Sequence, residues 1–468
     1  MANENLIAAA NELNNRSSYQ EALDLLSPVL KEEGTDYALL VAQGNAFYGL
    51  RRFEEAEKSY SKASRSNTSD VTALSNLAGV YFETARYEKG LDVCDKALLS
   101  QPENTTLLIH RGNMLSSMNR YAEAAETYAR ALKIAPEEPL ILFNLAYARM
   151  MTGQVGEAEE IYRRLLQIKP DEEEYLYAYA SFLEKTENFA QAADVYLKAL
   201  QIRDDPTVHI TLGGCLYNLQ LLGQTDEVLE LTDKWLAAFP ENPAALHMLE
   251  TIKNTPDVKR ASVAYVQELF DAFADSFDSV LEGLEYQAPA LIADEVKTIA
   301  FDSPPVVLDL GCGTGLCAAA MKEREIKTAS LSGIDLSSGM LKKAKERGLY
   351  SRLYQGDITA FTTAVTERFD LIVSADVLTY LGDLSAVFSE LSVVIKPAGK
   401  LVFTISENTQ NNEDYTMEPS GRFMHSKEYI RILLEKNGFD VDGVRSVELR
   451  QELGIPVKGL LFVAKKKI

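Results

Sequence analysis

The stretch that decides the fold of the second half of the chain reads PPVVLDLGCGTG, residues 304–315. It places an apolar, strand-like run directly before three glycines, and the helical segment LCAAAMKERE, residues 316–325, follows it. The cycle returns in TASLSGIDLS (328–337), SGMLKKAKERG (338–348), SRLYQGDI (351–358), RFDLIVSADVLTYL (368–381), LSAVFSELSVVI (384–395) and GKLVFTIS (399–406). Alternation at this spacing predicts a parallel sheet with helices on both faces.

The three glycines form a loop that favours close contact with a ligand. Gly311, Gly313 and Gly315 let the backbone turn sharply and approach a ligand that a Cβ atom would exclude. Their spacing is G-x-G-x-G, and Leu316 stands where the dinucleotide fingerprint G-x-G-x-x-G has its third glycine, which weakens a nicotinamide interpretation. The acid before the loop, Asp309, suits a ligand with an amino group and a positive sulfur better than a pyrophosphate.

Candidate site residues fall at the predicted strand ends. Ligands of such sheets bind outside the carboxyl ends of the strands, so we expect the chemistry around residues 309–315, 335, 357 and 374–380. Asp335 follows Gly315 by 20 residues, at the end of the next strand, where a carboxylate can accept two hydrogen bonds from a ribose diol.

The first 240 residues repeat with a period of 34, which is the period of tetratricopeptide units. Three columns carry the period: small residues at Ala10, Gly44, Ala78, Gly112, Ala146, Ala180 and Gly214; small residues at Ala22, Ala56, Gly90, Ala124, Ala158, Ala192 and, after a two-residue slip, Val228; and Leu26, Tyr60, Cys94, Tyr128, Tyr162 and Tyr196. This half resembles the tetratricopeptide family over about seven repeats, with a capping helix at 242–254. Such all-α solenoids present a concave groove that commonly binds peptides or proteins. The alternative is a rigid spacer or a dimerisation arm.

The glycine loop and the acidic strand ends resemble class I S-adenosylmethionine-dependent methyltransferases, whose order residues 303–405 follow. The resemblance implies a Rossmann-like α/β domain with S-adenosylmethionine as cofactor and no metal. It implies that the loop from Asp309 to Gly315 cradles the methionine part, that Asp335 holds the ribose, and that Asp357 and Ile358 face adenine. The implied cofactor-binding residues are Asp309, Gly311, Cys312, Gly313, Gly315, Asp335, Leu336, Met340, Asp357 and Ile358, with Ser374, Ala375 and Asp376 on the methyl-donor side.

Nearly the whole chain is similar to bacterial tetratricopeptide-repeat methyltransferases. The similar segments are 265–289, 375–384, SGRFMHSKEYI (420–430) and LRQELGIPVKGLLFVAKK (449–466). We therefore expect a repeat solenoid in residues 1–255, a linker with lid helices in 256–302, and a methyltransferase core in 303–468. Phe270, Phe273 and Phe277 share one face of the expected lid helix, where we expect them to pack as ordinary helix core.

Three residues are candidates for the acceptor side of the reaction: His425, Tyr380 and Arg422. His425 precedes the helix SKEYIRILLEKNG (426–438), and a neutral imidazole can act as a base toward a hydroxyl, carboxyl or amine. The alternative is that His425 bonds a loop carbonyl and orders the segment. Arg422 can clamp a carboxylate or phosphate, or pair with one of the chain's own carboxylates. Tyr380 lies just past the fourth predicted strand.

Composition excludes several classes of partner. A formal net charge of -22 argues against affinity based on neutralising nucleic-acid phosphates and disfavours docking on anionic lipid. Nowhere is there a run long enough to span a bilayer, so we expect a cytoplasmic protein that partners neither nucleic acid nor membrane. The cysteines at 94, 215, 312 and 317 form no CxxC pair, so neither a disulfide nor structural zinc is expected.

The fusion favours an enzyme that methylates a protein or peptide held in the repeat groove, because a small metabolite does not need seven repeats for recognition. Two alternatives stay open. The acceptor can be a small molecule or a carrier-bound acyl chain, with the repeats used for assembly. The chain can also be a non-catalytic scaffold that keeps the cofactor as a structural ligand.

Overall fold

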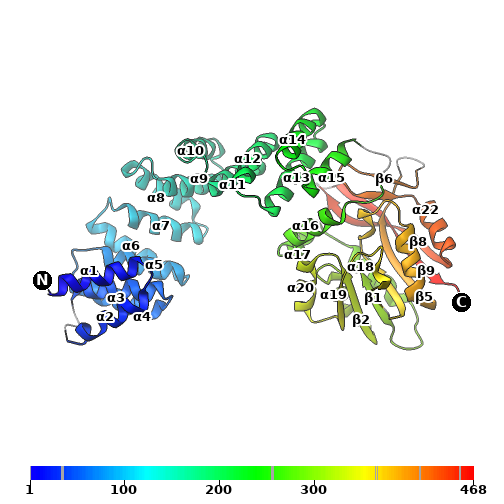
Figure 1. Cartoon of the computed structure of the whole chain (residues 1–468), viewed down its shortest axis with the longest axis horizontal. Helices are drawn as coiled ribbons and strands as arrows, with labels where there is room; N and C mark the ends of the chain where they lie inside the picture. Colours follow the sequence, from blue (N-terminus) through cyan, green and yellow to red (C-terminus); the bar gives the residue numbers. More distant parts are fainter. Residues whose placement is uncertain are drawn as a thin grey trace. The chain divides into compact units, whose positions relative to one another are not determined.

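The computed structural model of the chain describes residues 2–32, 36–253, 258–363, 365, 367–409, 413–452 and 455–468 (Figure 1). The chain divides into two compact units, Met1–Thr186 and Glu187–Ile468. The helical repeats continue past this division into the second unit. The predicted domain boundaries near residues 255 and 302 stay predictions, and the first of them lies outside the described residues.

The first unit is a series of helices of similar length that follow one another in pairs. They are α1 (Ala2–Asn15), α2 (Tyr19–Glu32), α3 (Tyr37–Gly49), α4 (Phe53–Ser66), α5 (Thr72–Glu83), α6 (Tyr87–Ser100), α7 (Thr105–Ser117), α8 (Tyr121–Ile134), α9 (Pro139–Met151), α10 (Val155–Ile168) and α11 (Glu173–Lys185). Each helix packs on the next along the chain. This confirms the predicted all-α repeat architecture.

The small and aromatic columns of the sequence meet inside these pairs. A Cβ atom added at Gly44 would lie 2.4 Å from the ring of Tyr60, and one at Gly112 would lie 2.3 Å from the ring of Tyr128. Each ring therefore fills the space that its glycine leaves open. The buried hydroxyl of Tyr128 donates to Oδ1 of Asn113 at 2.6 Å, which satisfies the one polar atom of the ring.

The period of 34 residues is also visible in the backbone. Left-handed residues that end the first helix of each pair recur at Ser17, Arg51, Ala85, Asn119, Gly153 and Glu187, and the next follows 36 residues later at Gly223. The helix before Gly223, α13 (Pro206–Leu221), has 16 residues where α11 has 13, so a longer helix accommodates the two extra residues. The slip seen in the sequence is thus absorbed within a helix.

The second unit contains a sheet whose strands run in the order β3-β2-β1-β4-β5-β9-β8. The strands are β1 (Val306–Leu310), β2 (Ser330–Asp335), β3 (Arg352–Gln355), β4 (Phe369–Ser374), β5 (Ile395–Ser406), β8 (Phe439–Glu452) and β9 (Ile455–Lys466). The pairs among β1 to β5 are parallel, and β9 is antiparallel to both β5 and β8. Strand order reverses beside β1, between β2 and β4, where ligands of open α/β sheets bind.

Helices cover this sheet and precede it. The unit begins with α12 (Phe189–Ile202), α13, α14 (Thr225–Ala238) and α15 (Pro243–Lys253), followed by α16 (Val263–Phe273), α17 (Phe277–Gly283) and α18 (Ala288–Thr298). Within the sheet region lie α19 (Leu316–Glu323), α20 (Ser338–Arg347), α21 (Ser385–Val394), α22 (Lys427–Lys436) and the short 3-10 turns η1 (Phe361–Thr363) and η2 (Leu378–Tyr380). Consecutive residues of β1, Val307 and Leu308, enter separate apolar cores, as expected for a sheet covered on both faces.

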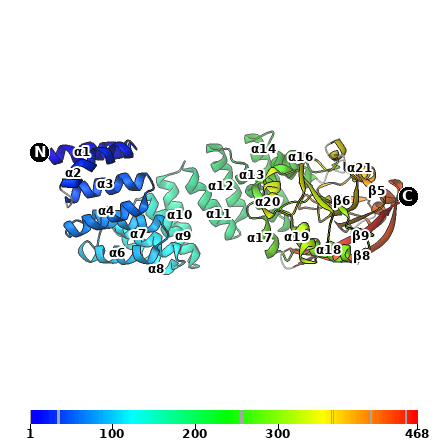
Figure 2. The ribbon, with the colours of Figure 1, turned by 90° about the horizontal axis from the view of Figure 1, so that it is seen from below.

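Two further features bear on the site. A small antiparallel pair, β6 (Tyr415–Met417) and β7 (Phe423–His425), follows β5. Helices α13 and α15 pack against α16 within the second unit, as Figure 2 shows for α13. Among the described residues no helix is both long and apolar enough to cross a bilayer.

Candidate active site

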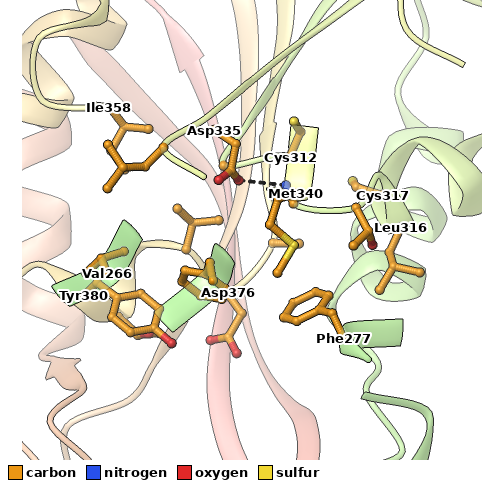
Figure 3. A pocket seen from close by; sticks show the side chains of 18 of the residues that line it. Val266, Phe277, Cys312, Leu316, Cys317, Asp335, Met340, Ile358, Asp376 and Tyr380 are labelled. Atoms are coloured by element: carbon orange, nitrogen blue, oxygen red, sulfur yellow. Dashed lines mark hydrogen bonds between the residues drawn. The ribbon is translucent and has the colours of Figure 1, made fainter. Parts of the chain in front are cut away.

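A cavity of about 220 Å³ lies in the second unit, at the carboxyl ends of β1, β2 and β4. Its lining comes from the lid helices, the glycine loop and the segments after the strands: Arg260, Val266, Phe270, Phe277, Leu281, Leu284, Tyr286, Pro289, Asp309, Gly311, Cys312, Gly313, Thr314, Leu316, Cys317, Asp335, Leu336, Met340, Gly356, Asp357, Ile358, Ala375, Asp376, Val377, Thr379, Tyr380, Leu381, Arg422 and Arg450. Most of the predicted cofactor residues therefore meet in one place (Figure 3).

The glycine loop runs close to the segment after β4. Gly311 has φ +69°, a left-handed value that glycine adopts without strain. A Cβ atom added there would lie 2.4 Å from both methyl groups of Val377. Any larger residue would push these two strand ends apart, so the glycine sets the width of the cavity at this point.

Asp335 is tied to the same loop. Its Oδ2 accepts the backbone N–H of Gly313 at 2.8 Å, drawn as the dashed line in Figure 3, and its Oδ1 accepts the N–H of Ser337 at 2.9 Å. Burial raises the pKa of Asp335, and the backbone N–H groups act in the opposite direction. The carboxylate is thus fixed in orientation at the carboxyl end of β2.

Asp309 is the most deeply placed acid of the cavity. Its side chain is buried, and the hydroxyl of Tyr350 donates to its Oδ2 at 2.6 Å. Burial raises the pKa of Asp309 to about 7, although the hydrogen bond from Tyr350 lowers it. A cation placed beside this group would restore its full negative charge at neutral pH.

Asp357 lies at the third strand end, with Ile358 beside it in the cavity wall. Arg260, from the segment before α16, pairs with its Oδ2 at 2.9 Å, and Thr359 donates to its Oδ1 from both the backbone N–H and the hydroxyl. Burial raises its pKa, but the hydrogen bonds from Thr359 and the charge of Arg260 outweigh burial, so the pKa is lowered overall. Asp357 is therefore ionised at neutral pH.

The side of the cavity after β4 carries a different set of groups. Asp376 pairs with the buried Arg450, and the hydroxyl of Tyr286 donates to the carbonyl of Ala375 at 3.2 Å. Tyr380 stacks edge to face on Phe270, with ring centroids 5.3 Å apart. In Figure 3 the side chain of Asp376 lies between those of Tyr380 and Phe277.

His425 does not line this cavity, and the prediction of a base facing the acceptor is corrected. The side chain is 0% exposed, and its Nε2 lies 2.8 Å from the carbonyl oxygen of Leu381 and 3.2 Å from that of Gly382. Burial lowers the pKa of His425 to about 4, so the ring is neutral and donates to the carbonyl. The alternative role, ordering a loop through a backbone carbonyl, fits this geometry.

Two predicted cofactor residues also stay outside the cavity wall. Gly315 begins α19 with φ +93°, and its place is taken in the wall by Thr314 and Leu316. Ser374 is buried and donates its hydroxyl to the carbonyl of Leu310 at 3.0 Å, which joins β4 to β1. Both residues shape the backbone next to the cavity without lining it.

Sequence reasoning missed several lining residues. Arg260 and Arg450 come from segments far from the glycine loop in sequence, so neither has a local signal that links it to the site. Phe270 and Phe277 were expected to be ordinary packed core, but both line the cavity, while Phe273 is 37% exposed. Phe270 lies in α16 and Phe277 in α17, so the single helical face expected from the sequence is divided between two helices.

Family models match one segment in the sheet region and three segments in the helical region. Residues 307–399 match the family described as a methyltransferase domain. Residues 41–105, 115–182 and 173–206 match families described as tetratricopeptide repeats.

Individual relatives each match about a third of this chain. A malonyl-[acyl-carrier protein] O-methyltransferase of Methylovorus sp. (strain MP688) is 32% identical over 165 residues, which cover 32% of this chain and 52% of that protein. The human methyltransferase-like protein 27 is 33% identical over 146 residues, 30% of this chain and 58% of that protein. A crystal structure of an S-adenosylmethionine-dependent methyltransferase from Methanosarcina mazei is similar at 19% identity and a TM-score of 0.30, over 36% of this chain and 95% of that one. The chain thus spans about half the length of the first of these relatives.

The class of domain implies S-adenosylmethionine as cofactor, and the cavity suits that molecule. The buried carboxylate of Asp309 suits an amino group, the partly buried carboxylate of Asp335 suits a pair of hydroxyls, and the apolar wall at Met340 and Ile358 suits an adenine ring. The chain carries tetratricopeptide repeats followed by a class I methyltransferase domain.

Proposed function

We propose that this chain transfers a methyl group from S-adenosylmethionine to a protein or peptide that its helical repeats recruit. The observation that carries the first part is the meeting of Asp309, Asp335 and the glycine loop at one cavity, with Asp335 bonded to the backbone of Gly313. A polar ligand with an amino group and a ribose fits these groups. Tyr380 and Arg422 line the same cavity, where an acceptor would contact them.

The chain's own residues would act mainly by binding and alignment. Asp309 holds the amino group, Asp335 the ribose, and Asp357 with Ile358 the adenine. The bound donor supplies a carbon that is already activated by a positive sulfur. Alignment of the acceptor with that carbon is then the main task of the protein, and alignment alone can contribute roughly 7–11 kcal/mol.

The repeats supply the argument for a macromolecular acceptor. An array of stacked helix pairs offers an extended surface that peptides and proteins bind, and a small metabolite does not require one. Within the second unit, the last helices of the array, α13 and α15, pack against the lid helix α16. An acceptor bound by these last helices would be held by the same unit that holds the cavity.

Methyl-labelled S-adenosylmethionine incubated with the full chain and an extract of the source cells tests this proposal. We expect the label to run with protein after denaturing electrophoresis. A chain shortened to residues 187–468 keeps the helices that support α16. It should bind S-adenosylhomocysteine normally yet lose most of the transfer, and undiminished transfer to the same acceptor would contradict recruitment by the repeats.

A second candidate acceptor is a carrier-bound acyl carboxylate. Arg422 and Arg450 both line the cavity; Arg450 pairs with Asp376, and the guanidinium of Arg422 can bind an acceptor carboxylate in a forked geometry. A carboxylate carries no proton at neutral pH, so its methylation needs no base. This fits the finding that His425 contacts the carbonyl of Leu381 and does not line the cavity. One relative is named for a malonyl-carrier acceptor. An alkali-stable label would exclude this candidate, because a methyl ester releases methanol in alkali. An alkali-labile label that neutral hydroxylamine, which cleaves thioesters, frees from the protein would favour a carrier-bound acyl group over a protein carboxyl group.

A further inference from the structure

His247 lies in α15, the last helix before the lid, and its side chain is 5% exposed. Its imidazole stacks on the ring of Tyr265 in α16, with centroids 4.1 Å apart and 25° between the planes. Two other residues of α16, Val266 and Phe270, line the cavity. The repeat helix and the cavity therefore meet at the same lid helix.

The same imidazole also lies against the turn that precedes Arg422. Gly421 has φ +73°, and a Cβ atom added there would lie 2.2 Å from Nε2 of His247. The turn is closed by two backbone hydrogen bonds, from Gly421 N–H to the carbonyl of Glu418 at 2.9 Å and from Glu418 N–H to the carbonyl of Arg422 at 2.7 Å. Because this tight turn packs against the imidazole ring, the backbone of Arg422 is held in position.

Arg422 and Tyr265 are close enough to act on each other. Burial raises the pKa of the Tyr265 phenol, and the positive charge of Arg422 opposes that rise. His247 thus contacts both the lid residue that neighbours Arg422 and the backbone that carries it. A single side chain of the repeat array supports two elements on the acceptor side of the cavity.

We propose that His247 is a positioning residue for the acceptor side of the cavity, holding Arg422 and α16 in place through Gly421 and Tyr265. The end of the repeat array then forms part of the acceptor wall in addition to any recruiting role. The inference rests on the proposed methyl transfer where it speaks of an acceptor. Its structural claim, that His247 holds the Gly421 turn in place, can be measured without an acceptor.

The test uses the full chain and three variants: His247→Ala, His247→Phe, which keeps a planar ring on Tyr265, and the control His110→Ala in α7. With saturating labelled S-adenosylmethionine, the extract concentration that gives half-maximal transfer should rise about tenfold in His247→Ala, because a displacement near 1 Å is enough to cost up to about 100-fold. His247→Phe and His110→Ala should stay near the parent. Affinity for S-adenosylhomocysteine should change by less than about twofold, since the cofactor residues are untouched.

The outcomes separate the two proposals. An unchanged half-saturating concentration in folded His247→Ala, or an equal loss of S-adenosylhomocysteine affinity, would overturn the positioning role. If no protein transfers label, the proposed function fails, and hydrogen–deuterium exchange of residues 415–425 decides the inference instead. Faster exchange in His247→Ala, restored in His247→Phe, supports it, and equal exchange in all four proteins overturns it.

Discussion

Nε2 of His425 lies 2.8 Å from the carbonyl oxygen of Leu381, the residue that follows Tyr380 in the chain. From the other side, the backbone N–H of Ala261 donates to the carbonyl of Tyr380 at 2.9 Å. The segment that carries Tyr380 is therefore held between Ala261, which precedes α16, and strand β7. The imidazole acts on the cavity through this backbone.

Replacing His425 should remove a pH dependence of stability. Burial lowers its pKa from the ordinary value of 6.5 to about 4, so between these pH values the unfolded chain binds a proton that the folded chain does not. The stability that this ring contributes is full above pH 6.5 and is lost as the pH falls toward 4, by roughly 3 kcal/mol in all. Urea unfolding at several pH values should show a shallower acid loss in His425→Gln than in the parent. The same slope in both proteins would contradict the burial.

Tyr380→Phe should lower turnover and spare cofactor binding. The change removes one hydroxyl from the acceptor side, and a hydrogen bond of about 0.5–1.5 kcal/mol corresponds to roughly a two- to tenfold loss in rate. Initial rates of label transfer measure it, with Tyr87→Phe in α6 as the control. A matching loss of S-adenosylhomocysteine affinity would instead assign Tyr380 to the cofactor.

Asp335→Asn should weaken cofactor binding directly. The variant keeps the shape of the side chain but loses the charge, and hydrogen bonds to charged groups contribute about 1.5–3 kcal/mol, or roughly 10- to 150-fold in Kd. Calorimetric titration with S-adenosylhomocysteine measures the change, and the exposed Asp302→Asn serves as a matched control. Affinity equal to that of the control would exclude Asp335 from the site.

Cofactor affinity should rise with pH across neutrality. The pKa of Asp309 is raised to about 7, so below that pH the carboxyl is protonated and must lose its proton to pair with a cationic amino group. The affinity of S-adenosylmethionine should therefore fall as the pH drops below about 7, by up to tenfold per pH unit. Asp309→Asn should bind weakly with no such slope. A slope that survives in this variant would place the titrating group elsewhere.

Asn113→Ala should destabilise the repeat array. The buried hydroxyl of Tyr128 and the side-chain amide of Asn144 both donate to Oδ1 of Asn113, so the change leaves two donors without this acceptor. An unsatisfied buried polar group costs about 1–3 kcal/mol. Thermal unfolding followed by circular dichroism measures the loss. Asn113→Ala combined with Tyr128→Phe should recover part of it, and no recovery would argue against this hydrogen bond as the cause.

Local sequence signals predicted the architecture well. The 34-residue columns marked Gly44 and Tyr60 as repeat positions, and the structure adds that the ring of Tyr60 fills the space that Gly44 leaves open. The strand ends anticipated Asp309, Asp335 and Asp357 at one cavity, because parallel strands bring their carboxyl ends to one edge.

Local sequence signals could not predict the positions of residues that depend on long-range packing. His425 looked available as a base, but whether a side chain enters a cavity or a backbone interface depends on how β7 packs. Arg450 reaches the cavity only because β8 pairs with β9 at the sheet edge, a register fixed by tertiary structure. The lid phenylalanines were ambiguous because an apolar helical face serves a core and a ligand equally well.

The measurement that tests the central claim most directly is the formation of S-adenosylhomocysteine by the full chain in an extract of the source cells, compared with the double variant Asp309→Asn, Asp335→Asn. The account predicts that the parent forms S-adenosylhomocysteine in step with methyl label on an acceptor, while the double variant forms almost none. If the parent binds S-adenosylmethionine yet forms no more S-adenosylhomocysteine than the variant, the domain is a scaffold and the proposed methyl transfer is wrong.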